Sequence, residues 1–202
     1  EKIEFKKLEK LRGKMCSFLY VIRNMRLYIR RITEKLTECQ AKGSKIIYRD
    51  DRLLDELKIW ACKDLKNIKT TRSWFEKRSE TVEMQRYRVS TDASNMAGGW
   101  VDIDGTERTF YWKPQDQHKH INIKEAIAIK AYINTNENKI KNKRLMFLCD
   151  NMSVVKTFHK GSKVPELNDE ILIINLLAIK LNCIFSIQHV TTDIQEADEA
   201  SR

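Results

Sequence analysis

The sequence lacks the features that mark membrane, secreted and zinc-binding proteins. It contains no apolar run of about 18 residues, the length that crosses a membrane as a helix. Its first residues, EKIEFKKLEKLRGK, lack the apolar block of a signal peptide. Its five cysteines are scattered and form no C-x-x-C pair, so neither a zinc site nor a disulfide framework is indicated. We therefore expect an intracellular protein of the nucleus or cytoplasm, not a secreted one, with reduced thiols.

The chain does contain enough apolar residues for a core, and it carries a strong positive charge in one half. Apolar residues make up 42% of the 202 positions, which suits one domain with a helical appendage. The net charge is +10, of which residues 1–85 carry +9 and residues 86–202 carry +1. A basic arm beside a near-neutral body favours a polyanionic partner, most simply nucleic acid. Solvated helix faces rich in lysine would give the same count, so charge alone leaves both interpretations open.

Residues 1–70 are predicted to form a helical segment. Apolar positions from Ile3 to Leu36 recur at helical spacing, and Gly13 predicts a break or a close packing point between two helices. A loop is predicted at 41–45 and a further helix at 50–66. The mostly polar residues 71–85 are predicted to be a linker.

Asp50 and Asp51 need a separate interpretation, because the sequence YRDD looks like the metal-binding turn of a nucleic-acid polymerase. Such a turn holds its carboxylates at the tip of a hairpin between two strands. Here the pair precedes RLLDELKIWACKDL, whose apolar residues have a helical period. Acidic residues in a first turn cap free N–H groups and complement the helix dipole. We interpret the pair as the charged start of a helix, not as a catalytic pair.

Residues 86–202 predict a mixed α/β domain. Three strands joined by hairpins come first, at 86–94, 98–103 and 108–112, and Asp-Gly at 104–105 is typical of a tight hairpin turn. The predicted order continues with a helix at 121–133, a strand at 144–150, helices at 151–160 and 165–181, a strand at 183–190 and a helix start at 196–202. This order predicts a five-stranded mixed sheet with helices packed on it.

Four carboxylates of this region lie where chemistry could use them. Asp92 follows an alternating strand, and Asp150 ends an apolar strand. Glu125 lies on the inner part of its helix, and Asp198 lies beside Ala197 in the last helix start. Each taken singly has a structural interpretation as a turn, cap or first-turn residue. Together they predict a pocket, because acids at the ends of neighbouring strands converge at one edge of a sheet.

A pocket of carboxylates favours a metal site. The acids repel one another unless a cation binds among them, and hard divalent cations prefer oxygen ligands. Such ions can activate water and stabilise the leaving oxygen of a phosphodiester. Mg²⁺ is the default expectation.

Four sequence blocks resemble the signature blocks of the ribonuclease H family. They read STDASNMAGGW, HINIKEAIAI, LCDN and EADEASR, and their order and spacing agree with that family over residues 86–202. They are most similar to the RNase H domains of retroelement reverse transcriptases, especially the DIRS-like group. The stretches LEKLRGKMCSFLYVIRNMRLYIRRI and RLLDELKIWACKDL resemble, more loosely, the thumb and connection of such enzymes. This resemblance implies an upstream polymerase domain in the same polypeptide.

The resemblance implies an RNase H-like fold and a metal-dependent endoribonuclease that cleaves the RNA strand of RNA–DNA hybrids. It implies that Asp92, Glu125, Asp150 and Asp198 are catalytic and hold two Mg²⁺ ions, with Mn²⁺ as an alternative. Asp92 would bridge the two ions. Glu125 would also approach the ribose 2′-OH of the RNA strand, which is how such a site distinguishes RNA from DNA.

Five polar residues near these acids are candidates for contacts with the substrate. They flank the acids in sequence or offer a charge to a phosphate: Ser94, Asn95, Asn122, Asn151 and Lys156. Ordinary loop and cap roles are equally compatible with the asparagines.

Two other functions remain open. The last-strand turn of the family, H-I-P-G-x-x-N, is HVTTDIQ in this chain, without the Pro-Gly pair. This departure favours a non-catalytic module that binds nucleic acid or protein on the same fold. A different nuclease or integrase of the superfamily usually ends its acids with a helix glutamate, where this chain has Asp198. The presence of four mutually repelling acids favours the hydrolytic enzyme.

Overall fold

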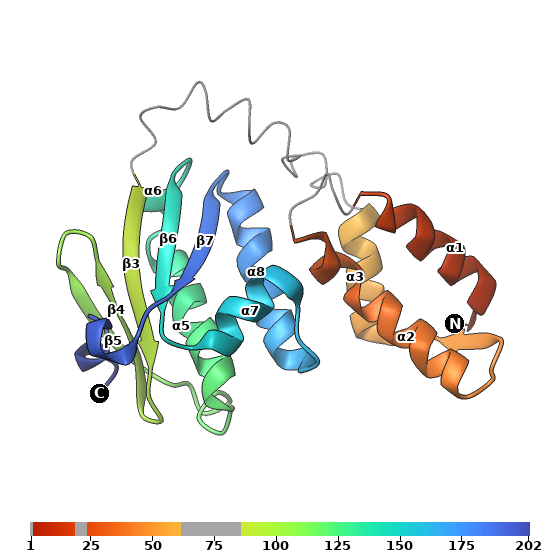
Figure 1. Ribbon diagram of the computed structural model, residues 1–202, viewed down its shortest axis with the longest axis horizontal. Coiled ribbons are helices and arrows are strands. Elements are labelled where there is room, and N and C mark those ends of the chain that lie inside the picture. Colours follow the sequence, from red (N-terminus) through yellow and green to blue (C-terminus); the bar gives the residue numbers. More distant parts are fainter. Residues whose placement is uncertain (1, 19–23, 62–85) are drawn as a thin grey trace. The chain divides into compact units, whose positions relative to one another are not determined.

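The structure is a computed structural model that describes residues 2–18, 24–61 and 86–202 (Figure 1). The chain divides into two compact units, Glu1–Val82 and Glu83–Arg202, which we term the N-terminal unit and the C-terminal unit. The predicted linker at 71–85 lies outside the described residues. Within the described ranges, no helix combines the length and the apolar character needed to cross a membrane.

The described part of the N-terminal unit is mainly helical. Its elements are β1 (Lys2–Glu4), α1 (Phe5–Cys16), η1 (Met25–Ile29), α2 (Arg30–Ala41), β2 (Ile46–Tyr48) and α3 (Asp51–Ala61). Buried apolar residues from all three α-helices form one core: Leu8, Met15, Ile32, Leu36 and Leu53. The helical spacing of these residues in the sequence therefore corresponds to one buried stripe on each helix.

Two predictions for this unit were wrong. Helix α1 runs through Gly13, and a Cβ at this position would meet no atom within 4 Å, so the glycine is neither a break nor a packing point. One glycine costs a helix only about 1 kcal/mol, which the packing of its neighbours can offset. Residues 2–4 pair antiparallel with residues 46–48, with Ile3 opposite Ile47. Three residues are too few for periodicity to separate a strand from a helix.

The predicted capping role of Asp50 is confirmed. Helix α3 begins at Asp51, and Asp50 Oδ1 accepts a hydrogen bond from the backbone N–H of Leu53 at 2.8 Å. The other carboxylate oxygen pairs with the guanidinium of Arg31 and lies 2.8 Å from Lys35 Nζ. Asp50 is thus engaged in joining α2 to α3. The helix predicted at 50–66 is described as far as Ala61, and residues 62–66 lie outside the described residues.

The C-terminal unit contains the predicted five-stranded mixed sheet flanked by helices. Its elements are β3 (Arg86–Ala93), β4 (Ala97–Asp102), β5 (Glu107–Tyr111), α5 (Ile121–Thr135), α6 (Glu137–Ile140), β6 (Arg144–Cys149), α7 (Met152–Lys160), α8 (Pro165–Lys180), β7 (Ile184–His189), η3 (Thr192–Ile194) and η4 (Glu199–Ser201). The strand order is β5-β4-β3-β6-β7. Strand β4 is antiparallel to β3 and β5, whereas β6 is parallel to β3 and β7.

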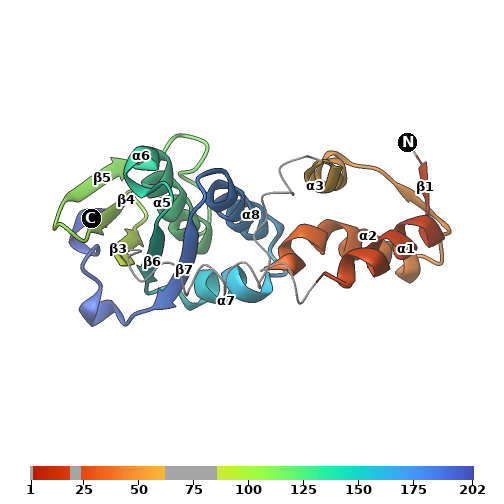
Figure 2. The ribbon, with the colours of Figure 1, turned by 90° about the horizontal axis from the view of Figure 1, so that it is seen from above.

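Helices α5 and α8 lie side by side against one face of the sheet, and the C-terminal segment crosses the other face (Figures 1 and 2). Strand alternation determines which residues face each layer. Trp100 of β4 contacts Tyr132 of α5 edge to face, whereas its neighbour Val101 packs with Ala200 of the C-terminal segment. The site therefore forms where segments from both layers reach the same end of the sheet.

The predicted strands and long helices of this unit agree with the structure to within two residues. Two details differ. The block at 196–202, predicted as a helix start, contains only the three-residue 3₁₀ turn η4. The short helix α6 is not predicted by the sequence pattern, because four residues carry too little periodicity.

Candidate active site

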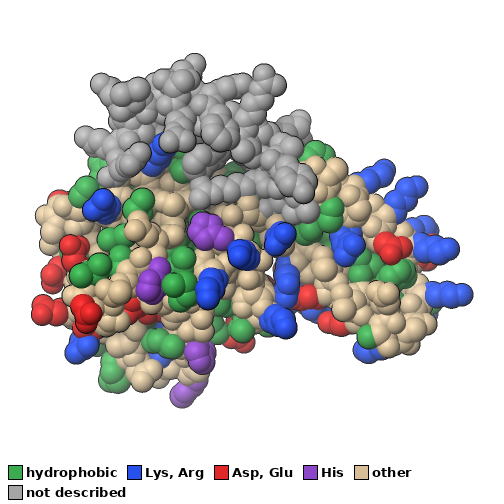
Figure 3. Space-filling model, in the orientation of Figure 1, with side chains coloured by type: hydrophobic (Ala, Val, Ile, Leu, Met, Phe, Trp, Pro, Cys, Tyr) green, Lys and Arg blue, Asp and Glu red, His purple; other side chains and the backbone are tan. Residues whose placement is uncertain are grey.

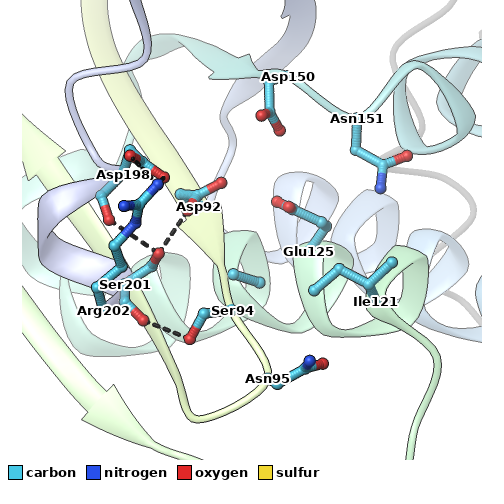
Figure 4. Close-up of a pocket in the computed structure, with 11 residues that line it drawn as sticks. Asp92, Ser94, Asn95, Ile121, Glu125, Asp150, Asn151, Asp198, Ser201 and Arg202 are labelled. Carbon is cyan, nitrogen blue, oxygen red and sulfur yellow. Dashed lines mark hydrogen bonds and ion pairs between the residues drawn. The ribbon is translucent and has the colours of Figure 1, made fainter. Parts of the chain in front are cut away.

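The four predicted acids line one pocket of about 640 Å³ in the C-terminal unit. Asp92 comes from β3, Glu125 from α5, Asp150 from the end of β6 and Asp198 from the turn before η4. Figure 4 shows the carboxylates of Asp92, Glu125 and Asp150 pointing toward one another, with Asp198 beside Arg202. Segments that are far apart in the sequence therefore bring four negative groups to one opening.

Strand pairing explains why Asp92 and Asp150 meet. Strands β3 and β6 are parallel, and Ser90 of β3 lies opposite Leu148 of β6. Each aspartate is two residues further along the chain, so both lie at the same edge of the sheet. Parallel neighbours place their carboxyl ends together, which makes this edge a common position for binding sites.

Asp92 is held in a buried position by the C-terminal turn. It is 6% exposed, and its Oδ2 accepts a hydrogen bond from the hydroxyl of Ser201. Burial raises the pKa of Asp92 and the charges of Asp150 and Asp198 raise it further, whereas the Ser201 hydrogen bond lowers it. A positive charge near Asp92 would therefore favour its ionised form.

Glu125 projects from the second turn of α5 and is 3% exposed. Burial raises the pKa of Glu125 to about 9, and the charges of Asp92 and Asp150 contribute to the rise. The Sγ atom of Cys149 lies 3.9 Å from Glu125 Oε2. With such a pKa, Glu125 keeps its proton at neutral pH until a cation approaches.

Asp150 follows β6 directly and is half-buried. Its Oδ2 accepts a hydrogen bond from the Thr192 hydroxyl at 3.1 Å, so the HVTTDIQ turn contributes to the site. Glu125, Cys149 and Asp150 each offer one ligand atom, and these three atoms lie within 4.8 Å of one another. The group can therefore hold a metal ion, and the carboxylates around it suit a hard divalent cation.

Asp198 is positioned by close packing of the C-terminal turn on β4. A Cβ on Gly99 would come within 2.3 Å of the Ala200 carbonyl oxygen, so only glycine permits this approach. The Thr109 hydroxyl donates a hydrogen bond to the same carbonyl at 2.7 Å. Asp198 itself pairs with Arg202 at 2.7 Å. The rim of the pocket thus carries a cation beside one of its acids.

The five residues predicted to contact the substrate are not equivalent in the structure. Ser94, Asn95 and Asn151 line the pocket. Asn122 adjoins it through its Oδ1, which accepts a hydrogen bond from Asn151 Nδ2 at 2.9 Å. Lys156 is exposed on α7 and does not line the pocket.

Sequence reasoning missed three residues of this region. Ser201 contacts Asp92, Cys149 contacts Glu125, and the buried Lys124 donates a hydrogen bond from Nζ to the Asn95 carbonyl at 2.9 Å. The serine of the block EADEASR offered a signal for the first of these. The burial of a lysine has no local signature, because its partners come from another strand and turn.

Comparisons with known proteins find distant similarities among solved structures. No protein-family model matches the chain, and no curated protein matches it. The RNase H1 of Halobacterium salinarum is 22% identical, with a TM-score of 0.48 and coverage of 57% of this chain and 93% of that chain. An RNase H1 isolated from compost, in complex with an RNA/DNA hybrid, is 13% identical, with a TM-score of 0.43 and coverage of 56% and 90%. The foamy virus protease-reverse transcriptase in complex with double-stranded DNA is 10% identical, with a TM-score of 0.40 and coverage of 94% and 35%. These sequence identities and TM-scores are too low to assign an activity to the chain.

Proposed function

We propose that this chain is a metal-dependent endoribonuclease that cleaves the RNA strand of RNA–DNA hybrids, as part of a reverse transcriptase. The observation that carries the proposal is the meeting of Asp92, Glu125, Asp150 and Asp198 in one pocket. The charges of Asp150 and Asp198 disfavour ionisation of Asp92, and those of Asp92 and Asp150 disfavour ionisation of Glu125. Bound cations would remove that penalty and attract an anionic substrate to the same opening.

The donor set of the pocket fits Mg²⁺, with Mn²⁺ as an alternative. Hard divalent cations prefer the carboxylate oxygens that all four acids offer, and these acids would hold two ions. Burial and the charges of Asp92 and Asp150 raise the pKa of Glu125 to about 9, and a cation bound beside it would favour its ionised form. Bound divalent cations would supply an activated water and a charge that stabilises the departing 3′ oxygen.

The chain's own residues would position the hybrid at this pocket. Glu125 would accept a hydrogen bond from the ribose 2′-OH and so distinguish RNA from DNA. The polar side chains around the acids, together with one exposed lysine of α7, would contact sugar and phosphate groups. These residues are Ser94, Asn95, Asn122, Asn151 and Lys156.

The charge of residues 1–85, which include the whole N-terminal unit, supports a nucleic-acid partner. These residues carry +9, and Figure 3 shows Lys and Arg side chains spread over the N-terminal unit on the face in view. Lysine and arginine bind phosphates irrespective of base sequence, which raises affinity for any duplex. Together with the resemblance to a thumb and connection, this charge supports an upstream polymerase domain as a partner in the same polypeptide, acting in the nucleus or cytoplasm.

Cleavage of a labelled RNA–DNA hybrid by the 202-residue chain in Mg²⁺ tests the proposal. Asp150→Asn retains the shape of the side chain and removes its charge, so we expect cutting of the RNA strand to fall at least about 100-fold. Asp104→Asn is the matched control, because Asp104 is exposed beside the β4–β5 hairpin turn and does not line the pocket. Equal binding of the hybrid by wild type and Asp150→Asn, without cutting by either, would identify a non-catalytic binding module instead.

A further inference from the structure

We propose that Ser201 and Ser94 are positioning residues that tie the turn carrying Asp198 to the strand carrying Asp92. This inference rests on the proposed function and specifies how its site is held together. Both serines line the pocket. Figure 4 shows the hydrogen bonds that connect them to each other and to the two acids.

The first link joins Ser201 to Asp92. Ser201 is 0% exposed, and its hydroxyl donates a hydrogen bond to Asp92 Oδ2. The same hydroxyl lies 3.1 Å from the backbone carbonyl oxygen of Asp198. Hydrogen bonds to an ionised acceptor are stronger than neutral ones, and water cannot replace a donor at a fully buried position. Because Ser201 lies in the same turn as Asp198, its hydrogen bond to Asp92 connects the first acid of the site to the turn that carries the last.

The second link joins Ser94 to Ser201. Ser94 follows Asp92 by two residues, and its hydroxyl donates a hydrogen bond to the Ser201 backbone carbonyl at 2.6 Å. The Ser94 oxygen also accepts hydrogen bonds from the backbone N–H groups of Met96 and Ala97 at 3.1 and 3.0 Å. The side chain that closes the β3–β4 turn thus also holds the C-terminal turn.

The C-terminal turn needs these links because it has little structure of its own. η4 contains three residues, too few to be stable as an isolated helix. Contacts of Ala200 with Gly99 and Thr109 fix the turn over β4 and β5. The two serines add the connection to β3 beside Asp92.

Metal binding is the property that this connection controls. Asp92 and Asp198 can share bound cations only if the turn and the strand keep their separation. Removal of groups that orient metal ligands commonly lowers metal affinity by about 10–100-fold. We therefore expect the two serines to affect metal affinity more than overall stability.

Isothermal titration calorimetry of Mn²⁺ binding to the full chain tests this expectation. Ser201→Ala and Ser94→Ala should each raise the dissociation constant for Mn²⁺ about tenfold. The separate variant Ser201→Thr, which retains the hydroxyl, should keep most of the wild-type affinity for Mn²⁺. Ser186→Ala on β7 makes the same chemical change outside the pocket, and should bind Mn²⁺ as wild type does. If Asp92→Asn loses Mn²⁺ while Ser201→Ala and Ser94→Ala bind it as tightly as wild type, the inference is wrong.

Amide hydrogen exchange without metal separates this inference from the proposed function. Exchange in residues 195–202 should be faster in Ser201→Ala and Ser94→Ala than in wild type, and unchanged in Ser186→Ala. A chain that shows this pattern but never cuts a hybrid would refute the nuclease and leave the serine links in place. A chain that cuts the hybrid, while both alanine variants keep wild-type exchange and Mn²⁺ affinity, would refute the serine links and leave the nuclease in place.

Discussion

Each unit of the chain buries a glutamate, and the two glutamates have opposite surroundings. Glu56 of α3 is 4% exposed, and burial raises its pKa to about 7. Its two oxygens accept hydrogen bonds from the backbone N–H groups of Arg31 and Ile32, at 2.7 and 2.9 Å. Glu125 of α5 has a pKa of about 9, and it faces other carboxylates across a pocket.

The comparison shows that burial and a raised pKa do not by themselves mark a catalytic acid. Glu56 completes the hydrogen bonding at the start of α2, where the first N–H groups have no partner within their own helix. It also lies at the positive end of that helix dipole. Glu125 lies instead among like charges in an open pocket, where ionising it costs free energy. A carboxylate in such surroundings indicates a site that binds a ligand, whereas Glu56 serves the fold.

The largest expected difference between the two glutamates is in catalysis. Glu125→Gln should lower the rate of hybrid cleavage at least about 100-fold, because an amide cannot supply the charge of a metal ligand. Glu56→Gln should leave the rate per folded molecule unchanged. Single-turnover cleavage in Mg²⁺ measures both rates. Equal losses in the two variants would mean that Glu125 acts only through the fold.

Substitution of Glu56 should lower the stability of its unit more than substitution of Glu125 lowers that of the other unit. Glu56→Ala removes the acceptor of two backbone N–H groups, and each unsatisfied group costs about 1–3 kcal/mol, so the N-terminal unit should lose at least about 2 kcal/mol. Glu125→Gln should leave the metal-free C-terminal unit unchanged at pH 7, because Glu125 is already protonated there. Hydrogen exchange in urea, read separately for the two units, measures these changes. A strong loss in the C-terminal unit would contradict the raised pKa of Glu125.

The pH dependence of stability should separate the units further. The pKa of each glutamate is higher in the folded chain than the ordinary value of 4.5, so each binds a proton more tightly when folded. Their contribution to the free energy of unfolding is therefore fully present below pH 4.5. It is lost as the pH rises, and the loss is complete near pH 7 for Glu56 and near pH 9 for Glu125.

Binding of Mn²⁺ should stabilise the C-terminal unit alone. At ten times its dissociation constant, Mn²⁺ should raise the free energy of unfolding of that unit by about 1.4 kcal/mol. An equal gain in the N-terminal unit would show that the ion binds elsewhere.

The smallest expected effect concerns Lys156, an exposed cation outside the pocket. Lys156→Ala should reduce the salt dependence of hybrid binding by about one phosphate contact, with only a few-fold loss of affinity. Lys180→Ala is the control, because Lys180 Nζ already pairs with Glu137 at 3.0 Å. Identical salt slopes for both variants and wild type would remove Lys156 from the set of substrate contacts.

Most of the C-terminal unit could be predicted because its signals are local. Short apolar runs bounded by turn residues mark the strands and longer apolar segments mark the helices, so these elements were found to within two residues. The C-terminal block was predicted as a helix start, but packing of Ala200 onto Gly99 leaves only a short turn. The β1–β2 pair was missed because each of its strands has three residues.

By itself, the sequence determined that Asp92 and Asp150 stand at strand ends and that Glu125 stands on a helix, because these positions follow from short-range periodicity. The resemblance of EADEASR to a signature block singled out Asp198. Only the tertiary structure decided what surrounds each acid. Ser201 reaches Asp92 across 109 residues, and Glu56 reaches the start of α2 across 24 and 25 residues. Whether a buried carboxylate completes a helix or repels its neighbours depends on such distant partners, and packing, not local pattern, brings them together.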